Sequence, residues 1–201
     1  MKLNENQLKE IDEKGYLIIP DCFSNEEINN LCKAMTTVFN EKTEANIVEK
    51  SSGVVRTAMG LHLRSKIFDD LTRHPKFFEP ACQIRGRNLY IQQTKINVKA
   101  AFTGEVWQWH YDFATHSGED GVPKPLALNL HVFLDDVTEF NGPLFFIPKS
   151  HKYGSAPSKL DTVTTNYPLW VVDQQAVKIL VKENGIVSAR GKAGTVVIFV
   201  D

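Results

Sequence analysis

The sequence is poor in cysteine, with only three in its 201 residues: Cys22, Cys32 and Cys82. They lie far apart, no two of them form a CxxC pair, and their number is odd. This pattern excludes a disulfide framework and a cysteine-rich zinc site as the basis of the fold. We interpret the three as buried thiols of a protein in a reducing compartment, and therefore predict a cytoplasmic location.

The sequence also lacks an excess of charge of either sign. Its 23 Lys and Arg residues offset 24 Asp and Glu residues and leave a formal charge of −1 at pH 7. This balance excludes the basic surface of a general nucleic-acid binder or of a protein that binds anionic membranes. No apolar run approaches the roughly 20 residues of a membrane span, and no apolar signal segment follows the polar start, MKLNENQLKEIDEK. We expect neither nucleic acid nor membrane as a partner, and the oligomeric state is open.

The composition is that of an ordinary globular domain. Hydrophobic residues make up 42% of the chain and charged residues 23%, and the length suits one domain with a sizeable core. We therefore predict a single domain over 1–201, with a mainly helical part over about 1–87 and a strand-rich core over about 88–201.

Capping residues mark two helices near the start of the chain. Asn4 can cap a helix that Gly15 ends, since glycine is favoured just after a helix. Ser24 and Glu27 have the spacing of a capping box, and an apolar stripe typical of an amphipathic helix follows them. Further helices are expected over 66–73, 76–85 and 174–182.

From about residue 88 the hydrophobic period changes from helical to strand-like. Residues 126–135 alternate most cleanly, with leucines and a valine on one face and Asn129 and His131 on the other. Other segments of strand character are 16–20, 89–99, 143–148 and 195–200. Strands joined by irregular Gly- and Pro-marked connections, without an alternating βαβ pattern, favour a jelly roll. The predicted fold class is mainly β with flanking α-helices around a double-stranded β-helix (jelly-roll, cupin-like) core.

The sharpest chemical signal is the sequence His110-Tyr111-Asp112. In a strand, residues i and i+2 point to the same face, so the imidazole and the carboxylate would converge. Such a pair, completed by a second imidazole from a distant strand, holds Fe(II) and leaves positions open. The tripeptide alone is weak, because it arises by chance in roughly one of three sequences of this composition. The alternative is a strand-end histidine beside a surface carboxylate.

Several longer segments surround this tripeptide in a fixed order: WQWHYDF (107–113), EDGVP (119–123), Asn129, TEFNGP (138–143) and IPKSH (147–151). With FDDL (68–71) and LYIQQTKINVK (89–99), they resemble the phytanoyl-CoA dioxygenase family of non-haem iron, 2-oxoglutarate-dependent oxygenases. Within that family the chain looks most like ectoine hydroxylases and bacterial hydroxylases of free amino acids such as leucine. The resemblance covers most of the chain and implies a jelly-roll core.

The resemblance implies that His110 and Asp112 are two of three iron ligands. A retained carboxylate at 112 indicates hydroxylation, because related halogenases carry a small residue there. The distal histidine of the family follows a strand that matches 194–201, and an arginine for 2-oxoglutarate lies further on. We therefore expect both groups after Asp201, in a longer protein, with His131 as the fallback third ligand.

The resemblance also implies which residues surround the small molecules. The positions implied around 2-oxoglutarate are Gln93, Asn97, Lys99 and Trp107. Lys99 matches a lysine that reaches a carboxylate of this cosubstrate, a role that suits a compact cation. The candidate substrate contacts are Lys95, His116 and His131. His116 stands where the ectoine enzymes carry tryptophan, which argues against ectoine. The alternatives are a solvated strand edge for both lysines and a structural, hydrogen-bonded role for His131.

We therefore predict an Fe(II)- and 2-oxoglutarate-dependent dioxygenase. It would use O2 to hydroxylate an unactivated C–H bond of a small zwitterionic metabolite, such as a free amino acid or a derivative. One alternative is a non-catalytic, truncated jelly-roll protein that binds a partner and has an incomplete metal site. Another is a metal-dependent isomerase or hydrolase on the same architecture, since fold does not determine function.

Overall fold

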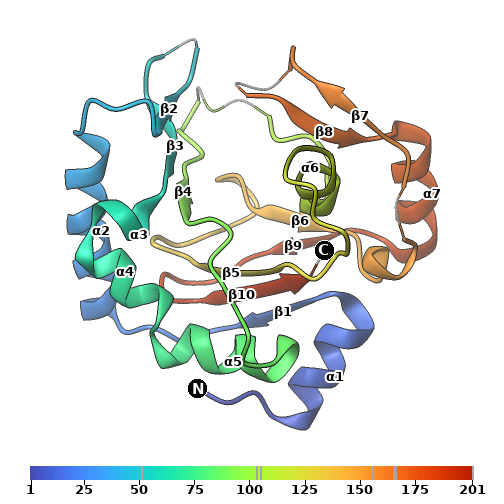
Figure 1. The fold of residues 1–201 in the computed structure, drawn as a ribbon, viewed down its shortest axis with the longest axis horizontal. Coiled ribbons are helices and arrows are strands. Elements are labelled where there is room, and N and C mark those ends of the chain that lie inside the picture. Colours follow the sequence, from blue (N-terminus) through green and yellow to red (C-terminus); the bar gives the residue numbers. More distant parts are fainter. Residues whose placement is uncertain (51, 103, 105, 155, 165–166, 201) are drawn as a thin grey trace.

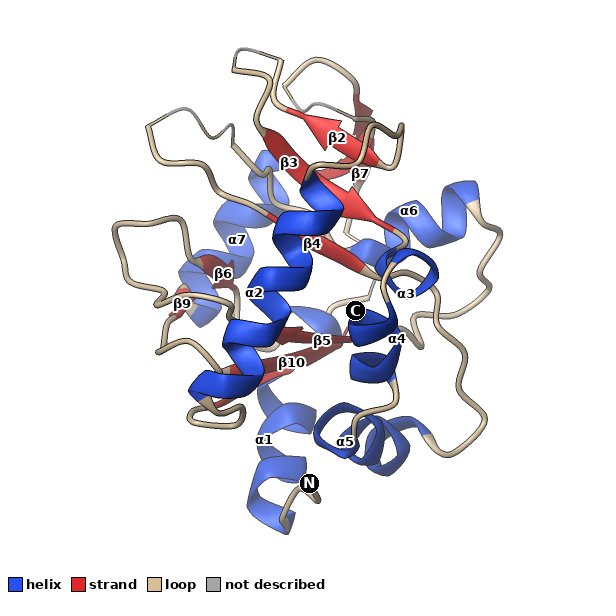
Figure 2. Ribbon diagram, turned by 90° about the vertical axis from the view of Figure 1, so that its left-hand side faces the viewer, coloured by secondary structure: helices blue, strands red, loops and turns tan. Residues whose placement is uncertain are grey.

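The computed structural model describes residues 1–50, 52–102, 104, 106–154, 156–164 and 167–200. Short antiparallel strands form the centre, and helices pack around them (Figures 1 and 2). The strands are β1 (Tyr16–Ile19), β2 (Asn46–Val48), β3 (Val55–Met59), β4 (Lys95–Asn97), β5 (Leu128–Val132), β6 (Leu144–Phe146), β7 (Ser158–Asp161), β8 (Leu169–Val172), β9 (Val187–Ala189) and β10 (Val196–Val200). The helices are α1 (Glu5–Lys14), α2 (Asn25–Phe39), α3 (Leu61–Arg64), α4 (Lys66–Thr72), α5 (Pro75–Arg85), α6 (Asp112–Glu119) and α7 (Gln174–Asn184), with a 3₁₀ turn at Ser150–Lys152.

Strands far apart in the sequence pair with one another. Among the described residues, β10 is the middle strand of the sheet β1–β10–β5, and β3 is the middle strand of the sheet β2–β3–β4. The pairs β6–β9 and β7–β8 complete the framework. The mainly helical first part of the chain therefore shares both three-stranded sheets with the strand-rich second part. Antiparallel pairing between distant strands, with helices on the outside, agrees with the predicted fold class.

Capping determines where the first two helices begin, as predicted. The side chains of Asn4 and Gln7 form a capping box at the start of α1, and Ser24 and Glu27 form one at the start of α2. Gly15 ends α1 with a φ of +86°, a left-handed conformation that favours glycine. The structure contains, within its described residues, no helix that is both long and apolar enough to cross a bilayer.

The apolar core lies between the β1–β10–β5 sheet and helices α2, α4 and α5. It includes Leu17 of β1, Leu31 of α2, Phe68 of α4, Phe77 of α5 and Ile198 of β10. The alternating face predicted over 126–135 is confirmed for the four members that pack against this core: Leu128, Leu130, Val132 and Leu134. Its first member, Leu126, precedes β5 and is 62% exposed. The opposite face of β5 carries His131 and points away from this core.

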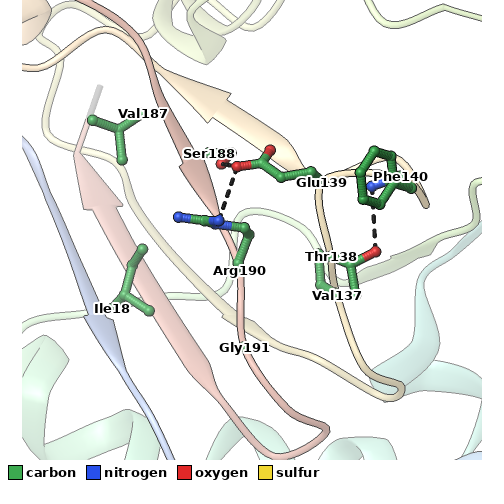
Figure 3. A pocket seen from close by; sticks show the side chains of 9 residues that line it. All are labelled: Ile18, Val137, Thr138, Glu139, Phe140, Val187, Ser188, Arg190 and Gly191. Atoms are coloured by element: carbon green, nitrogen blue, oxygen red, sulfur yellow. Dashed lines mark hydrogen bonds and ion pairs between the residues drawn. The ribbon is translucent and has the colours of Figure 1, made fainter.

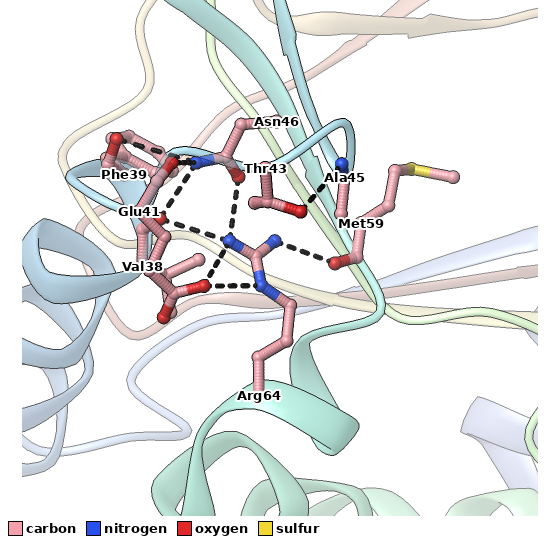
Figure 4. A network of polar contacts seen from close by, with 8 residues as sticks. All are labelled: Val38, Phe39, Glu41, Thr43, Ala45, Asn46, Met59 and Arg64. Atoms are coloured by element: carbon pink, nitrogen blue, oxygen red, sulfur yellow. Dashed lines mark hydrogen bonds and ion pairs between the residues drawn. The ribbon is translucent and has the colours of Figure 1, made fainter.

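Arg64 joins α3 to the end of α2 and to the β2–β3 hairpin (Figure 4). Its guanidinium donates to the carbonyl oxygens of Met59 and Val38, at 2.9 and 3.1 Å. It also donates to the Glu41 carboxylate and to Oδ1 of Asn46, at 2.7 and 2.9 Å. One side chain therefore joins helix α3 to the end of α2 and to the β2–β3 hairpin through several hydrogen bonds.

Two predicted strands differ from the structure. Of 89–99, only Lys95–Asn97 is a strand, because β4 pairs with β3 only opposite Thr57–Met59. The segment around His110 is not a strand, because helix α6 begins at Asp112. Strands β2, β3, β7, β8 and β9 were not predicted. Buried Arg56 and Thr57 obscure the apolar pattern of β3. Alternation in a sequence does not by itself supply the partner strand that pairing requires.

Candidate active site

His110 and Asp112 lie side by side where the chain enters helix α6. Tyr111 between them is extended, with φ −125° and ψ 142°, so the two flanking side chains lie on the same side of the backbone. Nε2 of His110 is 3.6 Å from Oδ1 of Asp112, and the two side chains are 27% and 25% exposed. The side chains converge as spacing predicts, although an extended residue before a helix produces this geometry instead of a strand.

A backbone carbonyl determines which nitrogen of His110 is free. Nδ1 of His110 lies 2.7 Å from the carbonyl oxygen of Gln108. A carbonyl oxygen only accepts hydrogen bonds, so Nδ1 carries a proton, and in the neutral form of the ring it is Nε2 that has the lone pair. Imidazoles that bind metals are commonly oriented in this way. The side chain of Tyr111 does not share the site, because its hydroxyl donates to the carbonyl oxygen of Ala156.

The Asp112 carboxyl has a lowered pKa. Burial alone would raise this pKa, but nearby positive charge outweighs burial and moves the pKa below its ordinary value. The groups that supply this charge are His110, Lys95, His116 and His131, of which the histidines do so only when protonated. The carboxyl is therefore ionised at neutral pH, the form in which aspartate binds a metal ion.

His131 faces away from the core, on the opposite side of β5. Its ring meets the ring of Phe199 edge to face, with 4.9 Å between their centroids. Burial, and after it the positive charge of Lys95, lower the pKa of His131 to about 4, although the Asp112 carboxylate opposes both effects. His131 is therefore a neutral imidazole at neutral pH.

This lowered pKa predicts a loss of stability in mild acid. As the pH falls from about 6.5 to about 4, the unfolded chain protonates His131 while the folded metal-free protein does not. We expect the free energy of unfolding to fall through this group by up to about 3 kcal/mol over that range. His131→Asn should flatten this part of the pH dependence in urea unfolding between pH 7 and 4. An equal slope in wild type and variant would contradict the assignment.

Strand β4 directs Lys95 and Asn97 to one side of its sheet and Ile96 into the core. Oδ1 of Asn97 accepts a hydrogen bond from the hydroxyl of Thr57 at 3.1 Å. Lys95 lies near enough to Asp112 to lower its pKa. Lys95 and Asn97 therefore share one face of β4, as residues two apart in a strand do. Gln93, which the resemblance places beside 2-oxoglutarate, precedes the strand and is exposed.

Lys99 lies beyond β4 and turns back toward its own loop. Its ammonium donates to the carbonyl oxygen of Gly104 at 3.0 Å. Its aliphatic stem lies against Gly142, where an added Cβ would come within 2.3 Å of Cγ of Lys99. Gly142 also has a φ of +82°, which favours glycine. The close approach of Lys99 explains the glycine at position 142 in the segment TEFNGP.

Trp107 lies within a stack of side chains that the sequence did not predict. The guanidinium carbon of Arg56 is 4.0 Å from the centre of the Trp107 ring. The ring of Tyr167 meets Trp107 edge to face, with centroids 5.7 Å apart. Arg56 is 51 positions before Trp107, and no spacing signal connects them.

His116 lies one helical turn after Asp112 on α6, a spacing that places both on one side of the helix. Its Nδ1 lies 3.1 Å from Oδ2 of Asp120, and the side-chain amide of Gln92 donates to the same oxygen at 3.2 Å. Sequence reasoning missed Asp120 and Gln92, although the i, i+4 spacing of His116 and Asp120 was a usable signal.

The described residues do not complete a three-ligand site. Among them, no group of three or more His, Cys, Asp and Glu side chains could hold a metal ion. His131, the fallback ligand, therefore does not join His110 and Asp112 in such a cluster. The third ligand expected after Asp201 stays a prediction.

Two other features lie apart from these residues. His151 makes a structural contact, since its Nε2 bonds to the carbonyl oxygen of Asp12 at 2.9 Å. A surface groove of about 660 Å³ runs beside β9 (Figure 3). In it, Glu139 accepts from Ser188 and pairs with Arg190, at 2.8 and 3.0 Å. The groove contains none of the predicted site residues.

Known proteins resemble this chain along nearly its whole length. The family Phytanoyl-CoA dioxygenase (PhyH) matches residues 11–201. An ectoine dioxygenase of Bordetella parapertussis is 33% identical over 209 residues, which cover 98% of this chain and 67% of that protein. An L-proline trans-4-hydroxylase of Streptomyces griseoviridis is 36% identical over 140 residues, 70% of this chain and 52% of that protein.

A solved structure shows the same fold. EctD from S. alaskensis, determined with 2-oxoglutarate and 5-hydroxyectoine, matches with a TM-score of 0.86 and 30% identity. The match covers 98% of this chain and 67% of that chain. This chain therefore spans about two-thirds of the length of the ectoine relatives that it matches, and the predicted jelly-roll class is confirmed.

Proposed function

This chain belongs to the phytanoyl-CoA dioxygenase family, and on that basis we propose that it is an Fe(II)- and 2-oxoglutarate-dependent hydroxylase. One observation carries the proposal: an imidazole nitrogen and a carboxylate oxygen, Nε2 of His110 and Oδ1 of Asp112, lie 3.6 Å apart. These two donor types are those of the 2-His-1-carboxylate iron site. In this proposal His110 and Asp112 hold the iron.

The bound iron and 2-oxoglutarate would supply the oxidative chemistry that activates O2 toward a C–H bond. The residues of the chain itself would hold the metal ion and orient the groups that bind it. The Gln108 carbonyl keeps the proton of His110 on Nδ1, so that Nε2 stays available. The positive charge around Asp112 keeps its carboxyl ionised.

We assign Gln93, Asn97, Lys99 and Trp107 to the 2-oxoglutarate site, on the strength of the family match. The Lys99 ammonium donates to the Gly104 carbonyl. Because an ammonium has three donors, it can also bind an oxygen of a carboxylate. Lys99 is the cation of this set, and a charge-assisted contact to a dicarboxylate is its expected role.

Lys99→Ala should therefore weaken 2-oxoglutarate binding. Loss of a charge-assisted contact removes about 1.5–3 kcal/mol, so we expect the dissociation constant to rise about tenfold or more. The measurement is a calorimetric titration of 2-oxoglutarate in the presence of Fe(II) or Mn(II). Lys152→Ala is the control, because Lys152 lies at the 3₁₀ turn and its nearest carboxylate is that of Asp12 at 3.8 Å. Unchanged affinity in Lys99→Ala would remove Lys99 from the site.

The substrate that this site suits is a small zwitterion such as a free amino acid or a derivative. Two of the relatives are an ectoine dioxygenase and an L-proline hydroxylase, and both names describe small molecules of this kind. Lys95 offers a cation for a substrate carboxylate, and His116 and His131 offer imidazoles near Asp112. His116 replaces the tryptophan of ectoine enzymes, which favours a substrate other than ectoine.

The test is Fe(II)-dependent consumption of 2-oxoglutarate by the natural full-length protein with a panel of free amino acids, L-proline and ectoine. We expect succinate to form only with Fe(II), and to increase with a zwitterionic substrate. His110→Ala is the inactive control. No turnover and no 2-oxoglutarate binding under any condition would overturn the proposal. That result would favour a non-catalytic binding protein. The described residues place only two ligand-type side chains together, and this would then explain the lack of turnover. The cytoplasmic location stays a prediction.

A further inference from the structure

We propose that Arg56 is a positioning residue for the cosubstrate site, and that with Glu49 it holds Trp107 and the backbone that leads to His110. The inference rests on the proposed function, because that proposal places Trp107 at the 2-oxoglutarate site. Neither Arg56 nor Glu49 lies in the segments around the metal-ligand pair. Both come from the β2–β3 hairpin, about 50 positions earlier in the chain.

Arg56 and Glu49 form an ion pair that is shut off from water. Their side chains are 0% and 1% exposed, and Nη1 of Arg56 is 3.4 Å from Oε1 of Glu49. Taking two charges out of water is unfavourable, and a well-packed apolar pair of similar volume is often as stable or more stable. Core packing alone therefore does not explain an arginine at this position. The hydrogen-bond donors and the planar cation of the arginine side chain do explain it.

Arg56 contacts the next segment at two points. Its Nη2 donates to the carbonyl oxygen of Val106 at 3.2 Å, and its guanidinium lies over the Trp107 ring at 4.0 Å. Trp107 therefore lies against a planar cation and meets Tyr167 edge to face. A cation over an indole is the strongest of the cation–π pairs, and a guanidinium also stacks flat on the ring. The ring and its backbone are thus oriented by one side chain.

The contacts made by Arg56 lead directly to the metal-ligand pair. Gln108, next to Trp107, provides the carbonyl that orients the His110 imidazole. Trp109 accepts a hydrogen bond from the backbone of Val172 in β8, at 2.9 Å. Residues 106–110 are therefore held by consecutive contacts, of which Arg56 makes the first two. A shift of Trp107 would change the 2-oxoglutarate site and the orientation of His110 together.

The first experiment removes both charges in the natural full-length protein. The double variant Arg56→Met with Glu49→Leu leaves no unpaired buried charge, so it should fold with a melting temperature near that of the wild type. We expect the 2-oxoglutarate dissociation constant, measured with Mn(II) by calorimetry, to rise about tenfold, as for other groups that orient a metal site. The single variant Arg56→Lys should also bind 2-oxoglutarate more weakly than the wild type, because lysine keeps the charge but lacks the planar guanidinium.

A double-mutant cycle separates positioning from general stability. In a Trp107→Phe background, the Arg56 and Glu49 changes should alter 2-oxoglutarate affinity by less than twofold, because the residue they position has gone. An equal loss of affinity in both backgrounds would overturn the inference. Arg64→Lys is the matched control, since Arg64 is a similarly bonded arginine outside the site (Figure 4). It should lower the melting temperature and leave the affinity unchanged.

Near-ultraviolet circular dichroism gives a readout that needs no ligand. The chain has three tryptophans, and the spectrum of Trp107→Phe identifies the contribution of Trp107. The double variant at 56 and 49 should lose most of that contribution. An unchanged Trp107 signal would overturn the inference whether or not 2-oxoglutarate binds. Failure of the wild type to bind 2-oxoglutarate, with loss of the Trp107 signal in the variant, would overturn the proposed function alone.

Discussion

Asp112→Gly is expected to abolish iron-dependent turnover of 2-oxoglutarate and to lower the iron content of the protein. The substitution removes the carboxylate that lies 3.6 Å from Nε2 of His110 and leaves a single ligand among the described residues. Loss of an outer group that merely orients a metal ligand typically lowers affinity or activity 10–100-fold. Loss of the ligand itself should exceed that, so we expect activity to fall more than about 100-fold. Iron per chain and succinate formation are the two measurements.

Three further variants make this result specific. Asp112→Glu should keep part of the iron, because it retains a carboxylate at a longer reach. Glu119→Gln is the control, since it neutralises an exposed carboxylate at the end of the same helix. His131→Ala in the same assay tests the fallback ligand, and iron retained in this variant would exclude it. Full activity in Asp112→Gly would show that Asp112 is not a ligand, and the proposed iron site would be wrong.

Ile198→Ala is expected to be strongly destabilising, because it truncates a fully buried side chain of the middle strand. Ile198 is 0% exposed and lies at the centre of β10, where it pairs with Leu17 of β1 and Leu130 of β5. Truncating a buried isoleucine to alanine removes apolar contacts and leaves a cavity, which lowers the free energy of unfolding by about 2–5 kcal/mol. A loss of this size is a large fraction of the stability of an ordinary domain. Urea unfolding monitored by circular dichroism gives the value.

The matched control for this change is Val163→Ala, at a side chain that is 82% exposed. It should change the free energy of unfolding by less than about 0.5 kcal/mol. A loss below about 1 kcal/mol for Ile198→Ala would contradict the central place of β10 in the core. The middle strand also supports a proposed site residue, because the next residue, Phe199, packs against His131.

Local interactions made some elements predictable. The capping boxes of α1 and α2 bind backbone groups within three residues of each cap, so the information for them lies within one helical turn. The apolar face of β5 followed from the alternation of its side chains, since a strand has a period of two. The closeness of His110 and Asp112 followed from their separation by one extended residue. It did so even though the segment is not a strand.

The sequence by itself therefore determined the helix caps, the apolar face of β5 and the closeness of His110 and Asp112. Each of these depends on neighbours within a few positions. Only the tertiary structure decided how far β4 extends, since the partner strand β3 sets its length. Only the tertiary structure placed Arg56 over Trp107 and His131 beside Lys95 and Asp112. Such contacts join residues tens of positions apart, and their energy depends on burial and on the charges that packing brings together. No local period in the sequence encodes either quantity.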